Sequence, residues 1–344
     1  MLNFKLPGLP SFDQIINQSP LAQAAGRMGA AALGVADKPS VTQAVYDELV
    51  HYFKYASTAY AIIVPGPQLI PVRPNGQKLC GKMWDLMTDT HGYVARDDKR
   101  MEVVVAFRGS ITPANFITDA LGFLVDWDAT RTKVVAPDGT KVHFGFQNAW
   151  CTISQKTFKI VTTELAAHPG YSIVVTGHSL GGALASVAAI TLQMLFPTTY
   201  ICLPLLYTYG QPRVGNPVFA AWVNTAIGPE RSFRVVHTFD GVPTMAPELL
   251  GYMHHSTEYW ALSPHSPQQT RICNGAGLAE DSQGSKKIPS TGINLPHFSV
   301  RRSAYSVKPS SRLTFMAVFW HLYDTVFNLR TLGNLMLWFM LLLL

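Results

Sequence analysis

The chain has 344 residues, of which 48% are apolar and 14% are charged, so it can bury the core of one large α/β domain. Its formal net charge of +6 accompanies no basic stripe interleaved with aromatic residues, which argues against nucleic-acid binding. Its four cysteines form no C-x-x-C pair, which argues against a zinc site. Two of them, Cys80 and Cys273, lie in polar segments and could pair in an oxidising compartment.

Residues 1–38 are rich in proline, glycine, alanine and glutamine, and we interpret them as a disordered leader outside the fold. No convincing signal peptide opens the chain, because prolines interrupt its beginning. The pattern changes at Ser40, which is placed to cap a helix that continues to about Ala61 with apolar residues at helical spacing.

Strands and helices alternate in the next part of the chain. Apolar runs that end at turn residues predict strands at Met101–Phe107, Tyr171–Thr176, Ile201–Tyr209 and Phe233–Phe239. Helical spacing predicts helices at Asn148–Leu165 and Ala183–Leu195. The alternation predicts an α/β domain over residues 39–300, with a mostly parallel central sheet and helices on both faces.

The composition changes again after about Val300. Residues 301–344 begin with several basic residues and end in the apolar run Met336–Leu344. That run is shorter than the roughly 20 residues that cross a bilayer. We therefore expect a tail outside the core that, if exposed, would attach weakly to a membrane or drive aggregation.

The strongest chemical signal is a G-x-S-x-G sequence at 177–181, between a predicted buried strand and a predicted helix. A sharp turn there would require Gly177 and Gly181 to lack a Cβ, and it would lift the Ser179 hydroxyl out of the sheet. The Leu180 N–H, at the start of the helix, would then face an oxyanion. We predict Ser179 as the nucleophile of an acyl transfer, the alternative being a glycine-rich turn with an incidental serine.

A second oxyanion donor is expected in a loop that follows an earlier strand. Ser110 follows Arg108-Gly109 at the end of a predicted strand and can offer both its N–H and its hydroxyl. Gly109 is placed to permit a tight turn there, and the alternative to an oxyanion donor is an ordinary strand-end turn. The next segment, Ile111–Asp126, has large apolar residues at approximate helical spacing and predicts an amphipathic helix.

The order Ser, Asp/Glu, His that accompanies such a turn limits the remaining partners. Of the three aspartates after Ser179, only Asp240 directly follows a predicted strand, where open α/β sheets place their sites. A turn aspartate is its alternative role. The histidines that follow it are His254, His255, His265, His297 and His321.

The stretch from about residue 45 to residue 298 resembles the fungal class 3 lipases, α/β-hydrolases that include triacylglycerol lipases and feruloyl esterases. The matching motifs are FRGS at 107–110, GHSLGG at 177–182, YGQPRVGN at 209–216, HTFDGVP at 237–243 and EYW at 258–260. The resemblance implies Ser179 as nucleophile, Asp240 as acid, and Ser110 with Leu180 as oxyanion donors. It also implies that no metal or organic cofactor takes part.

The resemblance favours His297 as the catalytic base. The polar segment 288–294 that precedes His297, and the number of residues between Cys273 and His297, both resemble the family pattern. The aromatic pair and glycine that usually follow the histidine are replaced here by Phe298-Ser299-Val300. His321, in an apolar stretch, remains the alternative. The usual partner of Cys273 is absent, and Glu280-Asp281 lies in that region instead.

The function implied is carboxylic ester hydrolysis, in the first place by a secreted triacylglycerol lipase acting at a lipid–water interface. In the resembling lipases a short helix at the position of 111–126 covers the site and opens at lipid. One alternative keeps the chemistry and changes the substrate to a feruloyl or other soluble ester. The other, from a different class, is a catalytically inactive, lipase-like binding or membrane-associated protein.

Overall fold

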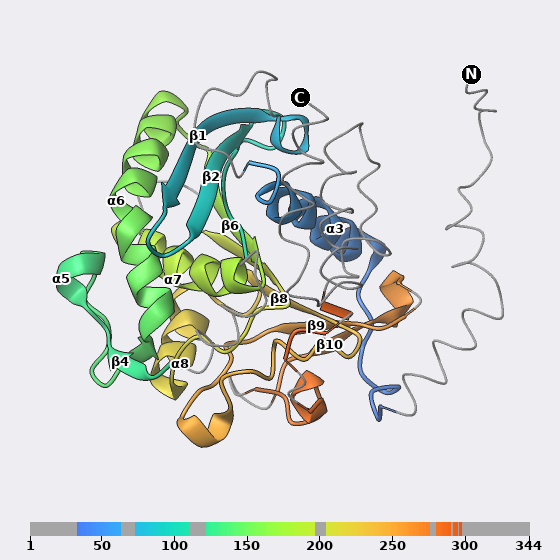
Figure 1. Ribbon diagram of the computed structural model, residues 1–344. Helices are drawn as coiled ribbons and strands as arrows, with labels where there is room; N and C mark the ends of the chain where they lie inside the picture. The colour runs from blue at the N-terminus through green and yellow to red at the C-terminus, as the bar shows by residue number, and fades with distance from the viewer. Residues whose placement is uncertain are drawn as a thin grey trace, which may run out of the picture. The chain divides into compact units, whose positions relative to one another are not determined.

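The structure is a computed structural model, and it describes residues 33–62, 73–109, 122–196, 204–263, 265–275, 280–289, 292–294 and 296–297. The strands are β1 (Lys78–Asp85), β2 (Thr90–Asp97), β3 (Glu102–Phe107), β4 (Leu124–Asp126), β5 (Lys141–His143), β6 (Ser172–His178), β7 (Leu205–Tyr209), β8 (Ser232–His237), β9 (Glu258–Ala261) and β10 (Thr270–Cys273). The α-helices are α3 (Gln43–Thr58), α5 (Ala129–Thr132), α6 (Phe144–Ala167), α7 (Leu180–Leu195) and α8 (Pro217–Ala226) (Figure 1). Short 3-10 helices are η1 (Pro74–Gly76), η2 (Glu248–Leu250), η3 (Pro267–Gln269) and η4 (Ser285–Lys287).

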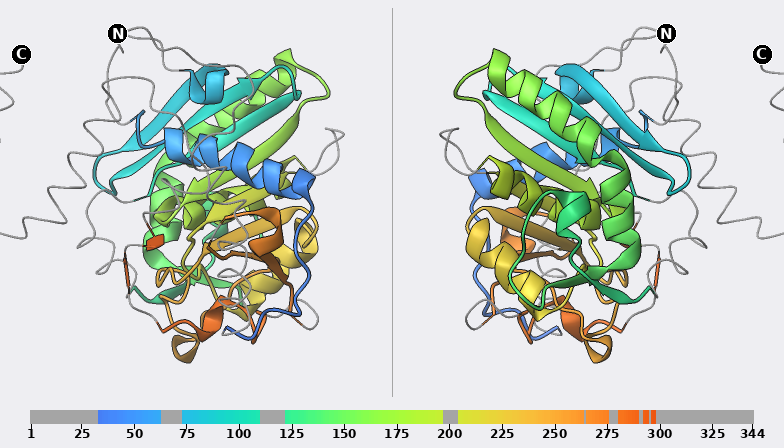
Figure 2. Two further views of the ribbon diagram at one scale, coloured as in Figure 1. Left: turned by 90° about the vertical axis from the view of Figure 1, so that its right-hand side faces the viewer. Right: turned by 90° about the vertical axis from the view of Figure 1, so that its left-hand side faces the viewer.

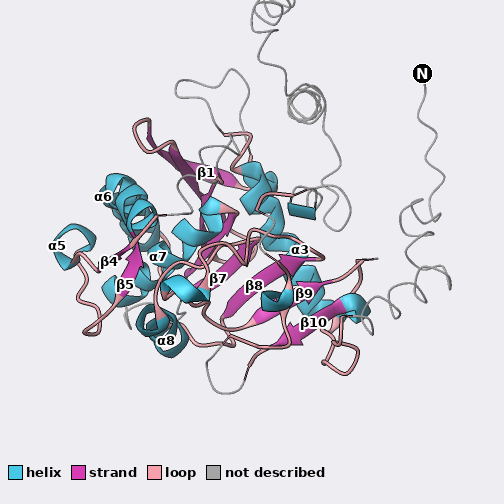
Figure 3. Cartoon of the chain, turned by 60° about the horizontal axis from the view of Figure 1, so that its bottom comes forward, coloured by secondary structure: helices cyan, strands magenta, loops and turns pink. Residues whose placement is uncertain are grey.

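Eight of the described strands form one sheet in the order β1-β2-β3-β6-β7-β8-β9-β10. The strands β7, β8, β9 and β10 lie side by side in Figure 3. The five strands from β3 to β9 in this order run parallel to one another. The outer pairs β1–β2, β2–β3 and β9–β10 are antiparallel. The parallel centre confirms the predicted α/β-hydrolase fold class, and it brings the carboxyl ends of β6, β7 and β8 side by side.

Helices cover both faces of the sheet, as predicted (Figure 2). Because side chains alternate along a strand, β3 contributes to two cores. Val103, Val105 and Phe107 pack in the core that includes α6, α7 and α8. Val104 and Ala106 pack in the core on the α3 side. Burial on both faces explains why the central strands are almost uninterrupted apolar runs.

Helix α3 differs in its start from the prediction. The Thr42 side chain, rather than that of Ser40, caps α3 by accepting a hydrogen bond from the Val45 N–H at 3.3 Å. Ser40 is extended and forms an isolated antiparallel bridge with Arg271. The helix also ends at Thr58 rather than near Ala61. The capping residue therefore lies two positions later than predicted, because Ser40 is still paired with Arg271 of β10.

The domain begins earlier than the expected boundary after residue 38. Val35 is fully buried in a small core with Trp260. Lys38 forms an ion pair with Asp281, with 2.7 Å between Nζ and Oδ2. The stretch 33–38 therefore packs on the domain, while residues 1–32 and the predicted tail 301–344 lie outside the described residues. Within the described part, no helix is long and apolar enough to cross a membrane.

The amphipathic segment predicted at 111–126 is only partly described. Residues 110–121, including Ser110, lie outside the described residues. At its end, Leu124–Asp126 is not helical but forms β4, which pairs with β5 in a separate antiparallel sheet. The helix prediction was therefore wrong for these last residues, because their backbone hydrogen bonds go to a neighbouring strand.

Candidate active site

Ser179 lies at the sharp turn between β6 and α7, with φ 61° and ψ −130°. Few non-glycine residues adopt this conformation, and such strain is typical of functional sites. A Cβ on Gly177 would lie 2.0 Å from the Gly181 carbonyl oxygen, and a Cβ on Gly181 would lie 2.4 Å from that of Phe107. The turn therefore requires both glycines, for the close approach that the sequence indicated.

Asp240 lies two strands away, in a turn that follows β8. The strand ends at His237, so the predicted strand end at Phe239 was two residues too late. The Asp240 N–H donates to the His237 carbonyl at 2.9 Å, and Asp240 Oδ1 accepts from the Val242 N–H at 2.9 Å. The side chain is fully buried. The turn thus fixes the carboxylate beside the carboxyl end of β8.

His297 meets this carboxylate. Its Nδ1 lies 2.9 Å from Asp240 Oδ2 and 3.0 Å from Oδ1, and both side chains are almost fully buried. A carboxylate can only accept, so Nδ1 carries the hydrogen and Nε2 carries the lone pair when the ring is neutral. This is the tautomer that a general base requires. His321 lies outside the described residues.

Gly210 and His178 connect this pair to the serine turn. A Cβ on Gly210, which follows β7, would lie 2.6 Å from Asp240 Oδ2 and 3.0 Å from the His297 ring. The ring of His178, the residue before Ser179, lies 4.6 Å from the His297 ring between centroids. The structure therefore brings Ser179, Asp240 and His297 to one end of the parallel strands.

His178 is also a hydrogen-bonding residue of this region. Its Nε2 lies 3.2 Å from the His297 carbonyl oxygen, and its Nδ1 lies 2.8 Å from the Tyr60 hydroxyl. Because the carbonyl can only accept, Nε2 carries the hydrogen and Nδ1 accepts from Tyr60. His178 thus holds the backbone of His297, which agrees with the structural role expected for it.

Of the two predicted oxyanion donors, the structure describes Leu180. Leu180 is the first residue of α7, so its N–H is one of the helix N–H groups that have no partner within the helix. A Cβ on Gly109 would lie 2.8 Å from Ser179 Cβ and 2.3 Å from the Tyr60 hydroxyl. Gly109 is therefore needed for close approach to the serine turn. Its neighbour Ser110 is not described.

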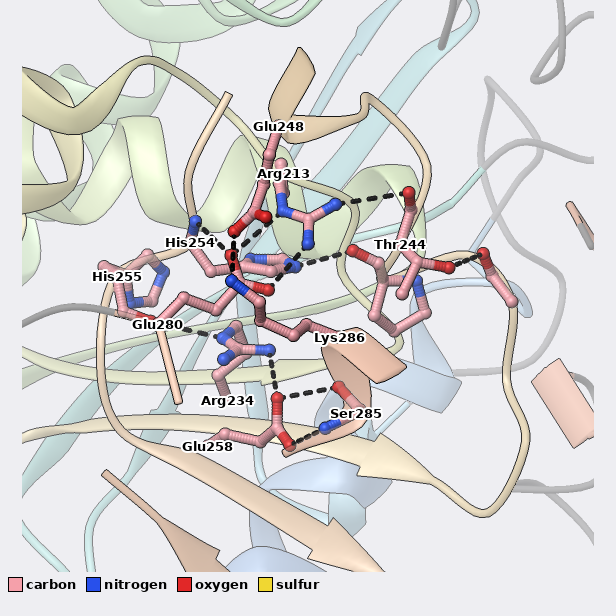
Figure 4. Close-up of polar contacts among 12 residues, drawn as sticks. Arg213, Arg234, Thr244, Glu248, His254, His255, Glu258, Glu280, Ser285 and Lys286 are labelled. Atoms are coloured by element: carbon pink, nitrogen blue, oxygen red, sulfur yellow. Dashed lines mark hydrogen bonds and ion pairs between the residues drawn. The ribbon is translucent and has the colours of Figure 1, made fainter. Parts of the chain in front are cut away.

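A buried ion pair joins the two loops that carry Asp240 and His297 (Figure 4). Arg213, in the segment after β7, contacts both Glu280 carboxylate oxygens, with Nε–Oε2 3.0 Å and Nη2–Oε1 2.7 Å. It also donates to the Thr244 carbonyl at 3.2 Å. One guanidinium therefore holds the loop after Asp240 and the segment that leads to His297.

A second buried ion pair holds the same segment further along (Figure 4). Arg234 on β8 pairs with Glu258 on β9, with Nη1–Oε2 3.0 Å. Glu258 accepts from the Ser285 N–H and from the Ser285 hydroxyl, both at 2.7 Å. An isolated bridge between Gly241 and Gly292 adds a backbone contact near Asp240. Polar contacts thus fix the segment that precedes His297 in the chain at several points.

The electrostatics of this network follow from burial and its two arginines. Burial would raise the pKa of Glu280, but the hydrogen bonds and charge of Arg213 outweigh it and lower that pKa. Burial, followed by the charges of Arg234 and Arg213, holds the pKa of His254 well below its usual value. His254 Nε2 therefore donates to the Pro243 carbonyl at 2.7 Å as a neutral ring. It packs rather than reacts, in line with the sequence interpretation.

The pairing considered for Cys80 and Cys273 was wrong. Both are free thiols, and they lie in β1 and β10, the opposite edge strands of the sheet. Strands are spaced about 4.8 Å apart, so the two cysteines are separated by roughly 30 Å, far beyond the reach of a disulfide. Both also lie in strands and not in the loops that their polar neighbours suggested.

Sequence reasoning missed the residues that hold the loops. In the sequence, Arg213 and Glu258 stand out only as parts of motifs, and Glu280 only as a residue in the region where the usual partner of Cys273 is absent. The signal that could have found them is the charge itself, because buried Arg and Glu side chains are almost always paired. In the described residues, no group of three or more His, Cys, Asp or Glu side chains could hold a metal ion.

Comparison with known proteins identifies relatives of this chain. Residues 104–250 match the family described as lipase (class 3). A lipase of Rhizomucor miehei is 31% identical over 264 residues, which make up 76% of this chain and 69% of the relative. A lipase of Rhizopus niveus is 35% identical over 76% of this chain, and the match spans 64% of the length of that relative.

Solved structures give the same result. A lipase from Rhizopus microsporus var. chinensis superposes with a TM-score of 0.65 at 32% identity, over 76% of this chain and 88% of its own. A triacylglycerol lipase whose catalytic centre is formed by a serine protease triad superposes with a TM-score of 0.66 at 29% identity, over 78% of this chain and 97% of its own. The chain belongs to the class 3 lipase family.

Proposed function

We propose that this protein is a serine carboxylic ester hydrolase that cleaves acylglycerols, with triacylglycerols as the first substrate class. The observation that carries the proposal is the convergence of a strained Ser179 with a buried His297–Asp240 pair at one end of the parallel strands. A relative of the same fold, a triacylglycerol lipase, has a catalytic centre formed by a serine protease triad, which supports the same chemistry here.

The proposed reaction is a two-step acyl transfer. His297 Nε2 takes the proton of the Ser179 hydroxyl as its oxygen attacks the ester carbonyl. The Leu180 N–H, with Ser110 as the second donor, stabilises the oxyanion of the tetrahedral intermediate. His297 then gives its proton to the leaving alcohol, and a water molecule, activated by the same ring, releases the fatty acid and restores Ser179.

Asp240 stabilises the charged ring that forms at each step. Its carboxylate accepts the Nδ1 hydrogen at 2.9 Å and is fully buried, so the attraction to the imidazolium is weakly screened. The hydrogen bond from the Val242 N–H holds one carboxylate oxygen in place. The acid therefore orients the base without itself taking the proton.

Exposed apolar side chains support a lipid substrate. Phe239, directly before Asp240, is 54% exposed, and Leu249, on η2 in the chain that follows, is 94% exposed. Phe123 stacks on Phe144 with 5.5 Å between ring centroids, and both rings are exposed. Single exposed apolar residues are common, but an exposed pair of stacked rings, together with two exposed apolar residues on the segment that carries Asp240, favours an aggregated lipid over a dissolved ester.

The site of action is proposed from relatives. A Fusarium solani protein that is 38% identical over 57% of this chain is a secreted mono- and diacylglycerol lipase. We infer secretion for this chain too, with action at a lipid–water interface. The apolar run at 336–344 would add weak membrane attachment.

A substrate screen tests the proposal. The protein is assayed on triacylglycerol and diacylglycerol emulsions, on short acyl esters and on feruloyl esters, with Ser179→Ala as the matched control. We expect hydrolysis of the acylglycerols by the parent and a loss of ~10⁴-fold or more in the variant, as for other triad nucleophiles. Equal rates in parent and variant would contradict the proposal. Activity on feruloyl esters alone would change the substrate class.

A further inference from the structure

Two buried histidines outside the proposed triad lie behind His297. His237 is the last residue of β8, and its Nδ1 lies 2.8 Å from the carbonyl oxygen of Pro296, the residue before His297. Its other ring nitrogen, Nε2, lies 2.8 Å from Nε2 of His265, in the segment between β9 and β10. The two rings are 4.5 Å apart between centroids, and both side chains are buried. They form a chain of contacts that ends at the peptide group between Pro296 and the proposed base His297.

The positions of the hydrogens in this chain follow from chemistry. The Pro296 carbonyl can only accept, so His237 Nδ1 carries a hydrogen. Burial, opposed by the Pro296 hydrogen bond and by Asp240, lowers the pKa of His237, so its ring is neutral and Nε2 is an acceptor. His265 Nε2 must then carry the hydrogen that it donates to His237. Burial and the neighbouring His237 lower the pKa of His265 to about 3, so this ring is neutral too.

His265 thereby selects the tautomer of His237. Without a donor at His237 Nε2, that ring could move its hydrogen from Nδ1 to Nε2 and lose its bond to Pro296. In the described part of the chain, His265 Nδ1 is a buried ring nitrogen with no hydrogen-bond partner. A hydrogen placed there would have no acceptor. This disfavours the opposite arrangement, in which His237 Nε2 donates to His265 Nε2.

The same peptide stretch is held from the other side. His178 Nε2 donates to the carbonyl of His297 itself, at 3.2 Å. The carbonyl groups of Pro296 and His297 flank the Cα atom of His297. Each therefore accepts a hydrogen bond from a buried histidine, and the two histidines lie on different strands. This fixes the backbone from which the ring reaches Asp240, and a reacting group needs such support because small displacements cost rate.

We propose that His265, acting through His237, is a positioning residue that holds His297 in place for catalysis. The inference rests on the proposed function, in which His297 is the base. His265 touches neither substrate nor the reacting atoms. It donates a hydrogen bond to His237, and His237 in turn bonds the Pro296 carbonyl beside His297.

Two substitutions at one position test the role of the donor. His265→Leu removes the hydrogen and keeps most of the volume, whereas His265→Gln keeps an N–H donor. Initial rates are measured on one dissolved short-chain ester, with near-UV circular dichroism to confirm folding. We expect His265→Leu to lower kcat on the order of tenfold with KM nearly unchanged, since a 1 Å displacement of a reacting group can cost ~10²-fold. We expect His265→Gln to stay close to the parent.

Three results would overturn the inference: an unchanged kcat in His265→Leu, an equal loss in both variants, or a loss that appears only in KM. A parent protein that hydrolyses no ester would instead contradict the proposed function, so the two failures are distinguishable.

A measurement on the unmodified protein keeps the inference testable if His265→Leu does not fold. In long-range ¹⁵N–¹H spectra of histidine-labelled protein at neutral pH, His237 should carry its hydrogen on Nδ1 and His265 on Nε2. The signals are identified with His265→Gln and His237→Asn. A hydrogen on His237 Nε2, or a charged ring at either position, would contradict the proposed chain.

Discussion

Replacing Glu280 by glutamine should lower the free energy of unfolding more than the same substitution at an exposed glutamate. Both Glu280 oxygens accept from Arg213, and Oε2 also lies 3.3 Å from the His254 N–H. Glutamine keeps the shape but leaves the guanidinium buried without its counter-charge. Removing one partner of a buried pair costs about 3–5 kcal/mol of unfolding free energy. At about 2–4 °C per kcal/mol for a large domain, the melting temperature should fall by roughly 6–20 °C.

The chain provides a matched control for this substitution. Glu248 pairs with Lys286 at 2.8 Å in the same region, but the Glu248 side chain is 41% exposed and that of Lys286 is 29% exposed. Glu248→Gln removes the same charge and should cost less than about 1 kcal/mol. The assay is thermal unfolding followed by circular dichroism, together with urea unfolding at 25 °C. Equal stability of Glu280→Gln and Glu248→Gln would refute the idea that the buried pair holds the two loops.

The pH dependence gives the same prediction a second test. The pKa of Glu280 is lower in the folded protein than in the unfolded chain. Its stabilising contribution is therefore complete above pH ~4.5 and is lost as the pH falls through the lowered folded pKa. The difference in stability between the parent and Glu280→Gln should shrink in that range. A difference that stays constant to pH 3 would contradict this assignment of charge.

Three further changes have expected outcomes. Gly177→Ala should prevent folding or give insoluble protein, because the new Cβ would lie 2.0 Å from a carbonyl oxygen, and a variant that melts like the parent would contradict the geometry of the turn. Burial, and then the charge of Arg234, lowers the pKa of His255 to about 4, so the parent should lose up to about 3 kcal/mol of stability as the pH falls from 6.5 to 4. Urea unfolding across this range should show a shallower loss in His255→Asn than in the parent. Truncation after Val300 should raise solubility without lowering the melting temperature, and a large drop would show that the removed residues pack on the domain.

The sequence was sufficient for the parts of the fold that repeat a simple pattern. The central strands are buried on both faces, so they appear as apolar runs with clear ends, and β3, β6, β7 and β8 were all predicted. The turn at Ser179 was predicted from glycine spacing, because its close contacts exclude any Cβ. Asp240 followed from its place after a strand.

The edges of the fold were not predictable in the same way. Strands β1 and β2 carry glycine, histidine and charged residues within a hairpin, so they lack a continuous apolar run or a clean alternation. Strands β9 and β10 have four residues each, and such short segments give little periodicity. Cys80 and Cys273 therefore seemed to lie in loops, and their strand positions reversed the expectation of a disulfide.

The contacts behind the site depend on tertiary structure that no local pattern encodes. Arg213 and Glu280 are 67 residues apart, and His237 and His265 are 28 residues apart, yet each pair is in direct contact. His297 was selected over His321 by resemblance alone. Its contact with Asp240, 57 residues earlier, became visible only in the folded chain.

Covalent labelling of the active serine tests the central claim most directly. The protein is treated with a fluorophosphonate, digested and mapped by mass spectrometry, with Ser179→Ala, His297→Ala and His321→Ala treated in parallel. The expected result is one adduct, on Ser179, that is absent from Ser179→Ala, strongly slowed in His297→Ala and unaffected in His321→Ala. An adduct on another residue, or labelling that is lost in His321→Ala and kept in His297→Ala, would contradict it.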